Sequence, residues 1–319
     1  MKAIFLALIL TTAQISFAKT KEVPKTKIRI GWQVPWAIQG QLVQILKNTD
    51  ILAKNGIEAE FIGKTAGPDL NELAMAGELD VLLTADQPAS TLFMKNKNWL
   101  GLFRLMYNRT STYVPVKSEI KTLADLKGKK VGVPFGTAAQ RVVTDAVEAE
   151  KVQDVNFINF GMMEHAPLIE RASPEDKKWG DFDALSGFDP IPAILEANGK
   201  VRMINKGKVC ALVVINRDFL AKNKDVAAKL NKSLKAAWAY YKTHVTEAND
   251  MFVKESQLTK ATPAALELAA EYEPNFKEKE IRTSFSPEDF KMIQNASDFV
   301  SKTTKIKIDI KDFVTNEYK

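Results

Sequence analysis

Short apolar segments alternate with amphipathic ones through the first two thirds of this chain, and this order constrains the fold most strongly. The apolar segments are rich in β-branched residues, and the segments between them repeat apolar residues at helical spacing. We expect strands at residues 28–32, 58–63, 80–85, 100–107, 112–116, 130–134, 156–160, 182–185, 201–205 and 210–215. Because strands that alternate with helices usually run parallel, the sequence predicts an α/β fold with helix-covered parallel sheets.

Helix start and stop signals lie between these strands. Asn55-Gly56 ends a predicted helix over 42–54, and Pro88 opens another. Beyond residue 216 the pattern is mostly helical, with expected helices at 224–244, 247–255, 263–270 and 287–302. Trp238, Tyr240 and Tyr241 belong to the first of these helices, and we expect them to pack in the core.

Composition narrows the classes of site that the chain can build. Its 319 residues suit two domains, or one domain with two lobes. A single cysteine, Cys210, excludes an internal disulfide and a multi-cysteine metal site, and we expect it to be a small buried hydrophobe. Two histidines leave little for zinc, so we expect neither a metal nor a cofactor. The net charge of +6 is spread among acidic residues, which argues against nucleic acid.

The first residues are typical of a secretory signal peptide. Lys2 is followed by the apolar run 3–10, and the small residues Ser16 and Ala18 precede a possible cleavage site. We expect cleavage after Ala18 and export; a buried strand or an uncleaved anchor is the alternative. No cysteine follows the apolar run, so we do not expect a lipoprotein. No later segment approaches the roughly 20 apolar residues of a spanning helix.

Three junctions between a strand and a helix carry candidate binding groups. They are residues 64–69, 84–88 and 134–138. Ligands of open α/β sheets bind beyond the carboxyl ends of strands, where helices begin and their free N–H groups attract anions. In the third junction, Gly136 allows close approach of a ligand and Thr137 can cap the helix. Ordinary helix capping is the alternative at each junction.

Three runs resemble one known family. "TAGPDLNELAMAGELDVLLTADQPA" (65–89), "IKTLADLKGKKVGVPFGTAAQ" (120–140) and "FDALSGFDPIPAILEANGKVRMI" (182–204) occur in its order. They are similar to segments of solute-binding proteins of ABC importers for aliphatic sulfonates, taurine and nitrate, in the thiamin-pyrimidine-synthase-like superfamily. The resemblance covers most of the chain from Lys27 to about His244.

The resemblance implies a periplasmic-binding-protein type 2 fold, with two α/β lobes around a ligand cleft joined by two crossovers. One lobe would comprise 27–112 plus 213–319, and the other 113–212. It further implies a monomeric periplasmic protein that is not an enzyme, closes around a small-molecule ligand and delivers it to an ABC permease in the inner membrane. An enzyme or a sensor-feeding protein on the same fold is the alternative. Motifs of common enzyme classes, such as a nucleophile elbow, a P-loop or HExxH, do not occur.

The resemblance also implies a ligand-binding set. It comprises Trp32, Gln33, Ala66, Gly67, Thr84, Asp86, Gly136, Thr137, Ala138, Phe188 and Asp189, with no catalytic or metal-binding residue. For three of these a structural role is the alternative: Asp86 as a helix cap, Asp189 as a turn residue, and Trp32 in the core. We expect His165 at the surface, although its loop could reach the cleft.

The predicted site favours an anionic ligand. We expect Gly136 and Thr137 to hold an anionic head, best matched by a sulfonate. Asp86 and Asp189 would repel that head, so they suit a far end that bears an amine or hydroxyl, and taurine satisfies both ends. A flat heterocycle such as a thiamin-precursor pyrimidine, stacked on Trp32 or Trp36, is the alternative ligand.

Overall fold

The computed structural model describes residues 25–318, and the predicted signal peptide over 1–18 lies outside them. The described strands form one eight-stranded sheet with the order β2-β1-β3-β8-β4-β7-β5-β6. The strands are β1 (Thr26–Gln33), β2 (Ile57–Lys64), β3 (Val81–Ala85), β4 (Trp99–Pro115), β5 (Lys130–Val133), β6 (Asn156–Asn159), β7 (Ala184–Phe188) and β8 (Val201–Asn216). In residues 25–318 no helix is long and apolar enough to cross a membrane.

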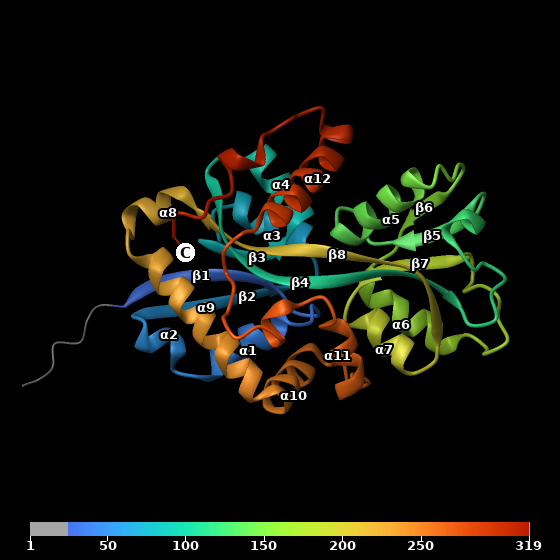
Figure 1. Cartoon of the computed structure of the whole chain (residues 1–319), viewed down its shortest axis with the longest axis horizontal. Coiled ribbons are helices and arrows are strands. Elements are labelled where there is room, and N and C mark those ends of the chain that lie inside the picture. The colour runs from blue at the N-terminus through green and yellow to red at the C-terminus, as the bar shows by residue number, and fades with distance from the viewer. Residues whose placement is uncertain (1–24, 319) are drawn as a thin grey trace, which may run out of the picture.

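Helices cover both faces of the sheet, as predicted for an α/β fold (Figure 1). One face carries α3 (Gly67–Met75), α4 (Asp86–Lys95), α5 (Ala138–Ala149) and α12 (Pro287–Thr304). The other carries α1 (Gln39–Asn48), α7 (Ile191–Ala197), α9 (Val226–Thr243), α10 (Val245–Ser256) and α11 (Pro263–Ala269). The remaining helices are α2 (Ile51–Lys54), α6 (Met162–Arg171), α8 (Arg217–Lys222), η1 (Leu123–Leu126), η2 (Pro274–Phe276) and η3 (Ile310–Asp312).

Two long strands run through the middle of the molecule and correct the sequence prediction. Each of β4 and β8 was expected as two short strands, and the sheet was expected to be parallel. Instead β8 pairs antiparallel with β3 and β4, and β4 pairs antiparallel with β7, so the sheet is mixed. The polar segments 108–111 and 206–208 looked like breaks, but they stay in strand because their backbones pair with each other.

The two ends of the sheet contain different groups of elements. Figure 1 shows β1, β2 and β3 at one end and β5 and β6 at the other, with β4 and β8 extending between them. The lobe boundaries predicted from the sequence, 27–112 plus 213–319 and 113–212, stay a proposal. They would place both changes of lobe inside these two long strands.

Aromatic side chains fill the core of the larger end. Trp238 is fully buried and its indole nitrogen donates a hydrogen bond to the Leu105 carbonyl at 3.1 Å. Tyr241 is also buried and Tyr240 is half-buried, so the predicted packing role is confirmed for the first two residues. Cys210 is fully buried on β8, as predicted.

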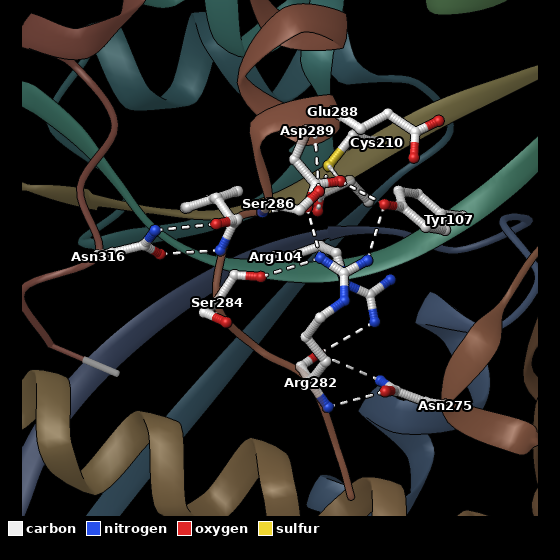
Figure 2. Close-up of polar contacts among 12 residues, drawn as sticks. Arg104, Tyr107, Cys210, Asn275, Arg282, Ser284, Ser286, Glu288, Asp289 and Asn316 are labelled. Carbon is white, nitrogen blue, oxygen red and sulfur yellow. Dashed lines mark hydrogen bonds and ion pairs between the residues drawn. The ribbon is translucent and has the colours of Figure 1, made fainter. Parts of the chain in front are cut away.

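A buried polar network fastens the C-terminal quarter to the long strands (Figure 2). Arg104 on β4 forms an ion pair with Glu273 at 2.7 Å, and both side chains are fully buried. The Tyr107 hydroxyl donates to Asp289 at the start of α12, and Arg282 forms an ion pair with the same carboxylate at 2.6 Å. Because each buried charge has an opposite partner, the network holds α12 against the sheet.

Candidate functional site

Three helix N-termini meet at one place beside the sheet. The helices α3, α4 and α5 each begin where the sequence predicted, directly after a strand or a short turn. A Cβ atom placed on Gly67 would lie 2.4 Å from Pro88 Cγ, and one on Gly136 would lie 3.1 Å from Pro68 Cγ. Gly136 also has a φ angle of 76°, which favours glycine. The two glycines therefore allow the starts of the three helices to touch.

The Thr84 side chain is buried among these helix starts. It is 0% exposed, and its hydroxyl has no hydrogen-bond partner in the described part of the chain. The hydroxyl oxygen lies 3.2 Å from the position that a Cβ on Gly67 would take. The first N–H groups of an α-helix have no intrahelical partner, and they carry partial positive charge. This arrangement surrounds a free hydroxyl with groups that favour an anion.

The predicted α5 site differs in one respect from the expectation. The Gly136 N–H donates to Gln140 Oε1 at 2.8 Å, and the Thr137 hydroxyl donates to the Pro134 carbonyl at 2.7 Å. Both groups are therefore engaged by the protein. Thr137 is the N-cap residue of α5, and Ala138 begins the helix, so the first N–H groups of the helix remain the donors of this element.

The Asp86 carboxylate is held in a buried ion pair. Arg141 Nη2 lies 2.8 Å from Asp86 Oδ2, and the Gln87 N–H donates to Asp86 Oδ1 at the start of α4. Burial raises the pKa of Asp86, while the Arg141 charge opposes that rise. The arginine was missed from the sequence. Its signal was a charged residue on the buried face of α5, between Ala139 and Val143.

The Asp189 carboxylate is engaged in the same way. Arg109 Nε lies 2.5 Å from Asp189 Oδ2, and the Ala193 N–H donates to Asp189 Oδ1 at 2.9 Å. Burial raises the pKa of Asp189 to about 6 against the opposing charge of Arg109. Arg109 also contacts Glu196 at 2.8 Å. Neither carboxylate of the predicted set is free, because each has an arginine partner.

Aromatic and amide side chains lie on the sheet side of the site. Phe188 contacts Trp36 edge to face, with ring centroids 6.3 Å apart. Trp32 is 2% exposed and belongs to the apolar core, with Lys47 above its ring at 5.6 Å. Gln33 is buried at the end of β1. The structure thus brings Phe188 against Trp36, whereas Trp32 packs in the core.

Residues 50–248 match the family model described as NMT1/THI5 like. The chain belongs to this family. A curated relative from Escherichia coli (strain K12), named "Putative aliphatic sulfonates-binding protein", is 26% identical over 197 residues. The match covers 60% of this chain and 58% of the relative, so the chain spans less than two thirds of that protein.

Solved structures show that this NMT1/THI5-like chain has the periplasmic binding protein fold. The alkanesulfonate-binding protein SsuA from Xanthomonas axonopodis pv. citri, bound to MOPS, gives a TM-score of 0.72 at 17% identity, covering 92% of this chain and 99% of that one. A Candida albicans protein described as having the generic periplasmic binding protein fold gives 0.65 at 14% identity, with coverages of 92% and 97%. The desulfurization enzyme DSZB, with biphenyl-2-sulfinic acid, gives 0.66 at 12%, with coverages of 92% and 97%.

A surface hollow of about 400 Å³ lies outside the predicted set in the NMT1/THI5-like chain. It is bordered by the turn after β1, the turn after β2, the start of α6 and the end of α10. Its lining residues are Val34, Pro35, Gly63, Lys64, Thr65, Asp69, Met163, Glu255, Ser256 and Gln257. Several of them directly adjoin predicted site residues: Val34 follows Gln33, and Thr65 precedes Ala66. The hollow therefore lies at the edge of the candidate site.

The prediction that His165 lies at the surface is wrong. The side chain is fully buried, and Nδ1 lies 2.6 Å from the Tyr113 hydroxyl. The residue was expected in a loop, but α6 begins at Met162 and turns it inward against β4. Burial lowers the pKa of His165 to about 4, because the charged imidazolium would lose its hydration.

Proposed function

We propose that this protein is the periplasmic solute-binding component of an ABC importer, exported with a cleaved signal peptide. It would capture a small organic anion, best matched by an aliphatic sulfonate, and deliver it to a membrane permease. One observation carries the proposal: three helix N-termini meet around the buried, unpaired hydroxyl of Thr84. Family membership and the names of the sulfonate-binding relatives support it.

The chemistry of a sulfonate suits this place. Its three oxygens accept hydrogen bonds and spread one negative charge, so backbone N–H groups and a hydroxyl can bind it together. The set Ala66, Gly67, Thr84, Thr137 and Ala138 would contact the head. Arg141 lies close by and adds positive charge, although Asp86 neutralises part of it.

Closure of two lobes would complete the site. Several contacts join the proposed lobes: the Arg141–Asp86 ion pair, the Trp36–Phe188 contact, and an ion pair between Lys302 of α12 and Glu148 of α5 at 2.6 Å. A ligand bound between the helix starts would touch both lobes and favour the closed arrangement. We propose that the closed form is the one that the permease recognises.

An enzyme on the same fold is the second candidate. The observation in its favour is the structural likeness to the desulfurization enzyme DSZB. The two candidates differ in the fate of the ligand: a binding protein releases it unchanged, and an enzyme converts it.

A thermal-shift screen tests the proposal directly. The chain without residues 1–18 is screened with alkanesulfonates, taurine, nitrate and a thiamin-precursor pyrimidine. A ligand present at 100 times its Kd adds about 2.7 kcal/mol to the free energy of unfolding, which raises Tm measurably. Mass spectrometry of the supernatant then shows whether the ligand is unchanged. A shift with the pyrimidine and none with any anion would refute the anion proposal, and turnover would refute the transport role.

A further inference from the structure

Four buried polar atoms near the candidate site have no hydrogen-bond partner in residues 25–318. They are Gln33 Oε1, Trp36 Nε1, Gln39 Nε2 and Asn108 Oδ1. Each of these side chains is at most 4% exposed. We call the four residues the amide cluster. A buried polar group without a partner costs about 1–3 kcal/mol, so four such groups in one region require an explanation.

Contacts bring the amide cluster together from three segments of the chain. The Gln33 N–H donates to Gln39 Oε1 at 2.6 Å, which fixes the direction of the second amide. Asn108 Nδ2 lies 3.5 Å from the Ala37 carbonyl, next to Trp36. The turn before α1, the middle of β4 and the end of β7 therefore meet here, because the Ala37 N–H in turn donates to the Asp189 carbonyl at 3.4 Å.

The groups of the cluster are uncharged. The indole of Trp36 is a hydrogen-bond donor, and the three amides supply both donors and acceptors. The two carboxylates of the predicted site already have cationic partners, since Asp189 pairs with Arg109 and Asp86 pairs with Arg141. An ammonium group placed here would be buried without an unpaired carboxylate, which is strongly unfavourable.

We propose that the amide cluster binds an uncharged hydrogen-bonding group of the ligand, such as a hydroxyl or a carboxamide. The protein then selects small organic anions with such a group and excludes zwitterions with an ammonium group. The inference rests on the proposed function, since it concerns the other end of the same ligand. It reverses the expectation that Asp86 and Asp189 receive an amine.

Matched ligands test this inference on the unaltered protein. The ω-hydroxyalkanesulfonates and ω-aminoalkanesulfonates of two to four carbons form pairs that differ only in one group. Calorimetry at pH 7 measures Kd for each member. We expect the hydroxy member of the best-binding length to bind at least tenfold more tightly than its amino partner.

One isosteric variant should reverse the preference. Gln39→Glu keeps the oxygen that accepts from the Gln33 N–H and replaces the unpaired NH₂ group with a second carboxylate oxygen. We expect it to bind the aminoalkanesulfonate at least tenfold more tightly than the wild type does. Gln44→Glu is the matched control: Gln44 is buried on the same helix, with an unpaired Nε2 that lies outside the amide cluster. It should leave the ligand preference unchanged.

The outcomes separate the inference from the proposed function. If both series bind but the amino members bind as tightly as the hydroxy members, the inference is wrong and the proposed function stands. The inference is also wrong if Gln39→Glu folds, binds sulfonate and keeps the wild-type preference. If no sulfonate of either series binds, the proposed function fails, and the inference fails with it.

Discussion

Replacing Thr84 with valine should change stability and ligand affinity in opposite directions. Valine has nearly the shape of threonine but carries a methyl group in place of the hydroxyl. That hydroxyl is fully buried and unpaired in the described chain, so its burial costs about 1–3 kcal/mol. Without ligand, we therefore expect Thr84→Val to raise the free energy of unfolding by about 1–2 kcal/mol, or roughly 2–6 °C in Tm.

The same substitution removes a donor that the proposed anion needs. A hydrogen bond to a charged group contributes about 1.5–3 kcal/mol, so affinity for a sulfonate should fall roughly tenfold to a hundredfold. Calorimetric unfolding without ligand and titration calorimetry with the best sulfonate measure the two effects. The opposite signs are informative because damage to the fold would lower both quantities.

Thr112→Val is the matched control for this experiment. Thr112 is also a buried strand threonine, but its hydroxyl donates to Ser186 Oγ at 3.2 Å. Removing it should lower the free energy of unfolding by about 1 kcal/mol. A lower Tm for ligand-free Thr84→Val, or an unchanged sulfonate affinity, would refute the assignment of Thr84 to the anion site.

Three further predictions concern other parts of the chain. Because the pKa of His165 is about 4 when folded and about 6.5 when unfolded, its contribution is fully present above pH 6.5 and is lost as pH falls through this window. Urea unfolding should show a loss of up to about 3 kcal/mol by pH 4, which His165→Gln removes. Arg141→Met should lower the free energy of unfolding by about 3 kcal/mol because it leaves Asp86 buried and unpaired, and adding Asp86→Asn should recover part of that loss in the same measurement. In a Gram-negative host, mass spectrometry of the periplasmic fraction should show a chain that begins after Ala18; full-length protein found only in the cytosol would contradict export.

The sequence predicted the order of elements and the helix starts well, because both depend on local signals. Glycine and proline next to a strand end locate α3, α4 and α5 within the chain. The continuity of β4 and β8 was not predictable from such signals. Residues 108–111 are polar and resemble a turn, and only their pairing with β8 keeps them extended.

The partners of the site residues were also beyond local reasoning. Asp86 and Arg141 are 55 residues apart, and Asp189 and Arg109 are 80 residues apart. Such pairs depend on which strands become neighbours, which no spacing rule gives. His165 was misplaced for a related reason, since the packing of α6 decides which of its faces is buried.

The continuous strands β4 and β8 imply that the proposed hinge is itself a piece of sheet. Backbone hydrogen bonds pair these strands from Trp99–Asn216 to Pro115–Val201, with a register shift between Thr112 and Tyr113. An opening motion would twist a two-stranded ribbon, and a bulge is a place where such a ribbon bends readily. The backbone amides of this ribbon would stay hydrogen-bonded in the open and the closed protein. Their hydrogen exchange should remain slow in both states, whereas a hinge made of loops would exchange rapidly when open.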